Sequence, residues 1–361
     1  MTDKKKILTI DGGGVRGLIA LGVLEQIEAT LRHETNNPDL LLCDYFDYIS
    51  GTSTGAILAT ALSIGMSTEE IRPFYLHCTK EILKKAGLSK RLYYKYQSES
   101  LKRILQEILG DATLGSDILK TNYMIVMRNA STGSPWVMSN NPLAMFNDRS
   151  LPDCNLDLPL WQLVRASTAA PSFFEPETIQ VADKEFHFVD GGVTPYNNPS
   201  FQTFLMATTD VYKMQWQTGT DKLLLVSVGT GMEPQVKKLL KTSDMHLGYI
   251  ATETPNALIS SASAEQDMLC RVFGECLYGK EIDMEVGDLI GSMGPVTDKL
   301  FTYMRYNIHL TQDGLSEVGI DDIRPDDVWA MDNIDHIDEL NRVGQAVGKE
   351  QVRAEHFAKF V

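Results

Sequence analysis

Two β-rich runs near the amino terminus each break at glycines and pass directly into an apolar helical pattern. The first unit covers residues 6–31 and turns at 11–17, after which apolar residues recur at helical spacing. The second unit is expected to be a strand over 44–49, a tight turn over 51–55 and a helix over 56–64. Two successive strand–turn–helix units predict an α/β fold with a parallel sheet and helices packed on it.

Later strands are expected at three segments, and no strand is as clear beyond the third. They are residues 123–128, 185–189 and 223–228. The last is a continuous apolar run, as expected for a central strand that is buried on both faces. We therefore expect a mostly parallel central sheet, with a weak domain boundary near Gly231 and mostly helical structure after it.

The charge balance excludes one class of partner. The chain holds 33 Lys and Arg residues against 48 Asp and Glu residues, which leaves a formal net charge of −15. A surface this acidic repels polyanions, so a nucleic-acid polymer is not expected as a partner.

The five cysteines form no CxxC pair and fit a reducing compartment. No apolar run approaches the ~20 residues that cross a bilayer and no export signal is evident, so we expect a soluble, cytoplasmic protein.

Residues 80–103 depart from the acidic character of the chain. The stretch holds eight basic residues against two acidic ones, together with Tyr93, Tyr94 and Tyr96. Basic residues with interleaved tyrosines suit a surface that touches anionic lipid head groups. A solvated basic helix explains the same composition, and the sequence does not decide between the two.

Residues 51–55 fit the G-x-S-x-G pattern of a nucleophile elbow, with Ser53 at its centre. The serine of such an elbow occupies a strained strand-to-helix turn, and the flanking glycines let neighbouring backbone pass without a Cβ clash. The same pattern also occurs in ordinary turns. Its place between an expected strand and an expected helix favours the elbow.

The glycine-rich stretch 11–17 admits two interpretations. Gly12, Gly14 and Gly17 satisfy the G-x-G-x-x-G dinucleotide pattern, so a nucleotide-binding protein that uses this loop as a phosphate cradle is the main alternative. The loop can instead be an oxyanion hole, since consecutive glycines expose backbone N–H groups that converge on one oxygen. Against a nucleotide site, no acidic residue that could bind a ribose ends the next expected strand.

Asp190 ends the strand expected over 185–189 and is followed by two glycines. In a parallel sheet the carboxyl ends of the strands share one edge, where Ser53 and the glycine loop also lie, so Asp190 is a candidate base. Histidine is the usual base for a serine nucleophile. None of the later histidines sits at a recognisable strand end or in a glycine-rich loop, and periodicity alone does not identify the base.

Five motifs stand in the order of the patatin-like phospholipase family, which this chain resembles. They are residues 11–17, 51–55, 166–171, 190–192 and 226–231. The similarity covers roughly residues 6–231 and is only loose beyond them. It implies a three-layer α/β/α fold with a catalytic core over 1–231. Residues 232–361 would then be a mostly helical part of the same domain and a candidate regulatory region.

The resemblance also implies what each motif does. Ser53 would be the nucleophile and Asp190 the general base of a catalytic dyad without histidine. The implied reaction is hydrolysis of acyl esters of membrane glycerophospholipids at the inner face of the cell membrane, with no metal and no cofactor. The residues of the implied oxyanion hole are Gly12, Gly13, Gly14 and, as the residue that orders this loop, Arg16.

Some bacterial members of the family resemble this chain in size, and in these the phospholipase is an antiphage effector that a cyclic nucleotide switches on. The resemblance therefore implies a cyclic dinucleotide as an activator, with antiviral defence as the setting. Arg305, which lies among Tyr303 and Tyr306, is the candidate contact for it. The alternatives to a lipase are the nucleotide-binding protein and a storage or interaction protein on the same fold. Acyl position, head group, the activating nucleotide and any homo-oligomer are not fixed by the sequence.

Overall fold

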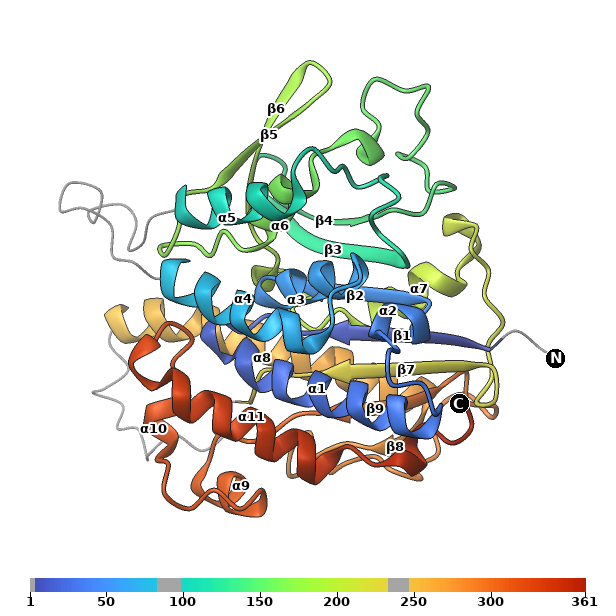
Figure 1. Cartoon of the computed structure of the whole chain (residues 1–361), viewed down its shortest axis with the longest axis vertical. Helices are drawn as coiled ribbons and strands as arrows, with labels where there is room; N and C mark the ends of the chain where they lie inside the picture. Colours follow the sequence, from blue (N-terminus) through green and yellow to red (C-terminus); the bar gives the residue numbers. More distant parts are fainter. Residues whose placement is uncertain (1–3, 83–98, 233–246) are drawn as a thin grey trace.

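The structure is a computed structural model that describes residues 4–82, 99–232 and 247–361. In this described part of the chain, strands form one sheet with the order β5-β6-β3-β2-β1-β7-β9-β8, and β4 pairs with β3 outside this order (Figure 1). The strands are β1 Lys5–Ile10, β2 Tyr48–Thr52, β3 Asn122–Asn129, β4 Ser134–Ser139, β5 Glu177–Val181, β6 Lys184–Asp190, β7 Leu223–Val228, β8 Glu275–Tyr278 and β9 Thr302–Tyr306. Pairs that involve β4, β5 or β6 are antiparallel, and all other pairs are parallel.

Helices cover both faces of this sheet (Figure 1), which gives the three-layer α/β/α architecture that the family resemblance implies. The helices are α1 Gly17–Glu34, α2 Leu42–Tyr45, α3 Thr54–Ser63, α4 Thr68–Ile82, α5 Glu99–Leu109, α6 Leu160–Ser167, α7 Ser200–Thr208, α8 Leu247–Phe273, α9 Gln312–Glu317, α10 Pro325–Val328 and α11 Ile337–Gln351. Side chains of β7 alternate between the two cores because successive residues of a strand point to opposite faces. Leu224 and Val226 join the core beneath α1, α3 and α11, whereas Leu223 and Leu225 join the core beneath α7.

Most of the predicted strands are confirmed, and one is displaced. The segments expected at 123–128, 185–189 and 223–228 lie within β3, β6 and β7. The strand expected over 44–49 is wrong at its start, because residues 42–45 form the short helix α2. The Asp44 carboxylate accepts the N–H of Leu41 at 3.1 Å, and this local cap holds the helical turn.

The segment after Met232 contains two strands that the sequence analysis does not predict. β9 pairs in parallel with β7, and β8 pairs with β9, so both extend the central sheet. The last long helix, α11, lies against α1 (Figure 1). The two backbones approach closely there, since a Cβ added at Gly344 would lie 2.4 Å from the carbonyl oxygen of Leu18. The C-terminal part therefore shares a sheet and a helical layer with the first strand–turn–helix unit.

Two strands meet end to end beside β3, and this brings the residues at their ends together. β2 runs parallel to β3, and its last residue, Thr52, is opposite Val126. β6 runs in the other direction, and its last residue, Asp190, is opposite Met127. β4 takes the other edge of β3, so the carboxyl ends of β2 and β6 face each other. The shared edge predicted for Ser53 and Asp190 is observed, but the predicted reason is wrong, because β6 is antiparallel.

Candidate active site

Ser53 lies in a strained turn between β2 and α3. Its backbone has φ 55° and ψ −125°, a conformation that a residue with a side chain rarely adopts. The chain passes closely over itself on both sides of this turn. A Cβ on Gly51 would lie 2.2 Å from the carbonyl oxygen of Gly55, and one on Gly55 would lie 2.3 Å from that of Ile10. The strand, strained serine and helix together have the geometry of a nucleophile elbow.

The hydroxyl of Ser53 donates a hydrogen bond of 2.6 Å to Oδ2 of Asp190. Both residues are nearly buried, with exposed fractions of 9% and 5%. The N–H of Gly192 donates to Oδ1 at 2.7 Å, so both carboxylate oxygens are held. Burial raises the pKa of Asp190 to about 6, against the opposing effect of the two hydrogen bonds and of the Arg165 charge. Such a carboxylate is mostly ionised at pH 7 and is a better proton acceptor than an ordinary aspartate.

One short segment holds the backbones of both residues. Ser167, at the end of α6, accepts the N–H of Ser53 at 2.9 Å and donates its own hydroxyl to the carbonyl of Val126 at 2.6 Å. The carbonyl of Ala169 accepts the N–H of Asp190 at 2.9 Å. The motif at 166–171 is visible in the sequence, but its contacts are not, because Ser167 and Ser53 are 114 residues apart.

Most of the glycine-loop N–H groups already have an acceptor within the protein. Gly12 donates to the carbonyl of Asn197 at 3.2 Å. Gly13 donates to the hydroxyl of Thr54, also at 3.2 Å. Within the described ranges, the N–H of Gly14 has no protein acceptor. The loop therefore offers the Gly14 amide and a weakly held Gly13 amide, not the row of free amides that a phosphate cradle uses.

Arg16 ties the glycine loop to the C-terminal part of the chain. Its side chain is buried, and Nη1 donates to the carbonyl of Trp329 at 3.2 Å. Gly14 packs against the same segment, since its φ is 61° and a Cβ there would lie 2.1 Å from the carbonyl oxygen of Met331. Only glycine suits a position with both constraints. These contacts are compatible with the ordering role expected for Arg16.

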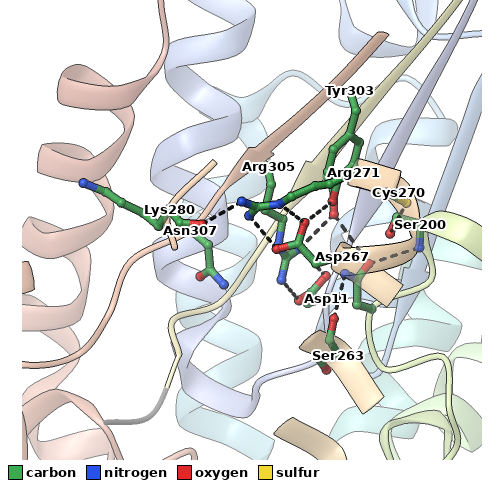
Figure 2. A network of polar contacts seen from close by, with 12 residues as sticks. Asp11, Ser200, Ser263, Asp267, Cys270, Arg271, Lys280, Tyr303, Arg305 and Asn307 are labelled. Atoms are coloured by element: carbon green, nitrogen blue, oxygen red, sulfur yellow. Dashed lines mark hydrogen bonds and ion pairs between the residues drawn. The ribbon is translucent and has the colours of Figure 1, made fainter. Parts of the chain in front are cut away.

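A buried cluster of charged residues includes Asp11, at the start of the loop (Figure 2). Asp11, the residue before Gly12, accepts two hydrogen bonds from Arg305, at 2.8 and 2.5 Å. Both residues are 3% exposed. Because the buried guanidinium is already held by a carboxylate, Arg305 is not free to contact an activating nucleotide, and the expectation that it does is wrong.

A cavity of about 600 Å³ opens beside Ser53. Ser53, Asp190 and the glycine loop form one part of its wall. Much of the remaining wall is apolar and includes Ile57, Leu101, Phe173, Phe174 and Ile259. The volume is typical of a small-molecule site, and the apolar lining next to a serine hydroxyl suits an acyl chain.

The remaining predicted features concern the cysteines, metal binding and membrane contact. All five cysteines are buried free thiols. The described ranges contain no cluster of three His, Cys, Asp or Glu side chains arranged to hold a metal ion, and no described histidine is a hydrogen-bond partner of Ser53. In the same ranges, no helix has the length and apolar character needed to span a bilayer.

Of the basic stretch 80–103, residues 83–98 lie outside the described part, so its contact with lipid stays a prediction.

Three comparisons place the chain among known proteins. The family model described as patatin, patatin-like phospholipase, matches residues 8–203. Patatin-17 from Solanum cardiophyllum is 31% identical in an alignment of 249 residues that covers 64% of this chain and 62% of the relative. Patatin-like protein 1 from Arabidopsis thaliana is 31% identical in an alignment of 259 residues that covers 64% of this chain and 60% of the relative. The chain thus spans less than two thirds of the length of the curated relatives that it matches.

One solved structure covers more of the chain at lower similarity. The crystal structure of VipD from Legionella pneumophila aligns with 94% of this chain and 67% of its own chain. The TM-score is 0.41 and the sequence identity 13%.

Proposed function

The chain belongs to the patatin-like phospholipase family, and from this premise we propose that it is a serine acyl hydrolase that cleaves acyl esters of membrane glycerophospholipids. The observation that carries the proposal is the hydrogen bond of 2.6 Å from Ser53 to Asp190 in the wall of a largely apolar cavity. Ester hydrolysis through a covalent intermediate needs a nucleophile, a base within hydrogen-bond reach and room for the acyl chain.

In the first half-reaction, Asp190 takes the hydroxyl proton of Ser53 as the oxygen attacks the ester carbonyl. Negative charge develops on the carbonyl oxygen, and we assign its donors to the N–H groups of Gly13 and Gly14. Three glycines are expected from the sequence as oxyanion donors. We leave out Gly12, because its N–H donates to the backbone carbonyl of Asn197. The amino terminus of α3 directly follows the serine and adds partial positive charge.

The intermediate then collapses and the bond between the acyl carbon and the lipid alcohol breaks. Asp190 returns the proton to the leaving oxygen, and the acyl group remains as an ester on Ser53. In the second half-reaction Asp190 takes a proton from water, which attacks the acyl carbon. The fatty acid leaves and the proton returns to Ser53, so the dyad ends in its starting state.

A nucleotide-binding function has less support. A phosphate cradle needs several backbone N–H groups that are free to point at one ligand. In the loop, the Gly12 amide donates to a backbone carbonyl and the Gly13 amide is released only if a ligand displaces the Thr54 hydroxyl, so at most the amides of Gly13 and Gly14 can point at a ligand. A nucleotide-binding protein would keep its function in Ser53→Ala, whereas a serine hydrolase would lose it.

We place the reaction in the cytoplasm, at the inner face of the cell membrane, where the lipid substrate lies. A lipase in that compartment damages its own membrane unless it is held inactive. The family resemblance makes a cyclic dinucleotide the proposed activator, with antiviral defence as the setting. No contact residue is assigned to this activator. An absence of cyclic dinucleotide binding, or binding with no gain in lipase activity, would remove this part and leave the hydrolase intact.

The experiment is release of fatty acid from mixed phospholipid vesicles, with and without a panel of cyclic dinucleotides. Wild type, Ser53→Ala and the control Ser150→Ala are compared, since Ser150 is an exposed serine outside the cavity. We expect release by wild type and by the control, and none by Ser53→Ala. Equal release by Ser53→Ala and wild type would contradict the proposal.

A further inference from the structure

Arg16 holds the glycine loop near its helix end, and Asp11 is the side chain that can hold it at its strand end. Residues 12–14 are all glycines, so between positions 11 and 14 only Asp11 offers a side chain. Arg305 of β9 clamps that side chain, with Nη1 donating to Oδ1 at 2.8 Å and Nη2 to Oδ2 at 2.5 Å. A two-pronged contact between a guanidinium and a carboxylate fixes direction as well as distance.

Arg305 is itself held by residues of other elements (Figure 2). Ser227 of β7 accepts a hydrogen bond from Nη1 at 2.8 Å. Asp267 of α8 lies 4.0 Å from Nε and also accepts the hydroxyl of Tyr303 at 2.9 Å. Arg271 donates to both oxygens of Asp267, at 2.8 and 2.7 Å. Arg305 is therefore held in turn by a hydrogen bond to β7, whereas α8 contributes only a carboxylate charge 4.0 Å from Nε.

Stability alone does not explain why these charges are buried. Asp11, Asp267, Arg271 and Arg305 are each at most 5% exposed. Removing charges from water is costly, and an apolar replacement of a buried ion cluster is often equally stable or more stable. The four charges sum to zero, so the cluster is electrically balanced. Its contact with Asp11, at the start of the glycine loop, points to a role in what the loop does.

An unpaired Asp11 carboxylate would oppose the proposed reaction. The loop amides would have to stabilise an oxyanion while a negative charge lay at the start of the same loop, and that repulsion is strong in a buried site. Burial raises the pKa of Asp11, and the charge of Arg305 counters this. Asp11 in turn raises the pKa of Arg305, so the guanidinium keeps its charge.

We propose that Arg305 is a positioning residue for acyl transfer, which holds the oxyanion loop through Asp11 and neutralises the Asp11 carboxylate. It acts through Asp11 and the loop amides of Gly13 and Gly14. The inference rests on the proposed function, since a loop without an oxyanion to bind needs no such support. It goes beyond that function because it assigns a role to a residue outside the five motifs.

The test compares wild type with Arg305→Met, Arg305→Lys and Arg271→Met on a soluble short-chain p-nitrophenyl ester. Each kcat is divided by the fraction of protein that is labelled at Ser53 when its reaction with a fluorophosphonate has gone to completion. Misfolded protein is then not counted as enzyme. We expect kcat to fall about 100-fold in Arg305→Met and about tenfold in Arg305→Lys, which keeps the charge but loses the fork. KM should change less than about threefold, because the substrate ground state gains nothing from an oxyanion donor.

Arg271→Met is the matched control. It removes a buried arginine from the same cluster but leaves the pair of Asp11 and Arg305 in place. We expect a lower melting temperature and a kcat within about threefold of wild type. We also expect the double variant Asp11→Asn/Arg305→Met to be at least about tenfold faster than Arg305→Met, because it no longer contains the unpaired carboxylate.

Two results would overturn the inference. One is a kcat within about threefold of wild type in the Arg305 variants, and the other is an equal loss of kcat in Arg271→Met and Arg305→Met. If Arg305→Met does not fold, Arg305→Lys decides by the same criterion. A wild type that is not labelled at Ser53 would contradict the proposed function itself. That result is distinct from a labelled wild type whose rate does not depend on Arg305.

Discussion

Asp190 and Asp11 are both buried aspartates that follow or end a strand beside the same cavity, yet their neighbours prepare them for opposite tasks. Asp190 accepts hydrogen bonds from two neutral donors, Ser53 and Gly192, and its pKa rises to about 6. Asp11 is clamped by the guanidinium of Arg305. Burial raises the pKa of both carboxyls, but at Asp11 the charge and hydrogen bonds of Arg305 counter that rise directly.

Replacing Asp190 should have the largest effect on activity. Asp190→Asn removes the proposed base and keeps the size of the side chain, so we expect kcat to fall about 10³-fold. The matched control is Asp183→Asn, an exposed aspartate in the turn between β5 and β6, which should leave kcat unchanged. Fatty acid release and esterase assays both report the loss. An Asp190→Asn variant with near wild-type kcat would remove Asp190 from the mechanism.

The same comparison predicts stability changes of opposite sign. The folded protein binds the Asp190 proton more tightly than the unfolded chain, so ionised Asp190 costs stability progressively as pH rises from 3.8 through about 6. Asp190→Asn should therefore raise the free energy of unfolding at pH 8, by on the order of 3 kcal/mol. Asp11→Asn should lower it by about 3 kcal/mol, because Arg305 loses its carboxylate partner. Urea unfolding at pH 8 measures both, and changes of equal sign would contradict the distinction.

The rate should depend on pH through Asp190. Its carboxylate must be ionised to accept the Ser53 proton, so kcat should fall as pH drops through about 6 and reach about a tenth of its plateau near pH 5. Burial raises this midpoint, and the hydrogen bonds from Ser53 and Gly192 and the charge of Arg165 lower it. Arg165→Met should move the midpoint to higher pH, since that charge lowers the pKa. A flat profile down to pH 5 would show that another group is the base.

The smallest of these effects concerns the support of the serine backbone. Ser167→Ala leaves the N–H of Ser53 without its acceptor. Loss of a buried hydrogen bond is worth ~1 kcal/mol, so we expect kcat to fall about fivefold with little change in KM. Ser150→Ala serves as the control. An unchanged kcat in Ser167→Ala would show that the turn holds Ser53 without this contact.

The sequence predicts the parts of the site that local patterns encode. Ser53 and the glycine loop each stand in a strand–turn–helix unit of consecutive residues, so spacing and turn chemistry are enough to find them. Asp190 is found for a partly wrong reason, because its strand is antiparallel and reaches the site by meeting β2 end to end. The direction of β6 is set by its pairing with β3, which is distant in the sequence, and no local pattern encodes that pairing.

The supports of the site are set by contacts between distant segments and are not predicted. β9 is a short buried strand that contains the charged residue Arg305. Its sequence therefore lacks the continuous apolar run by which a buried strand is recognised. That charge is tolerated because Asp11, 294 residues earlier, faces it. Ser167 lies in a visible motif, but its contact with Ser53 spans α6 and β2. In the same way, local capping by Asp44 outweighs the β-rich composition of residues 44–49.

The most direct measurement is mass spectrometry of the acyl-enzyme on Ser53 during turnover of a p-nitrophenyl ester. The sample is quenched within the first turnovers, digested and searched for the acylated peptide. We expect the acyl group on Ser53 in wild type, and its formation slowed about 10³-fold in Asp190→Asn. An acyl group on another residue, or equal acylation rates in the two proteins, would contradict a mechanism built on Ser53 and Asp190.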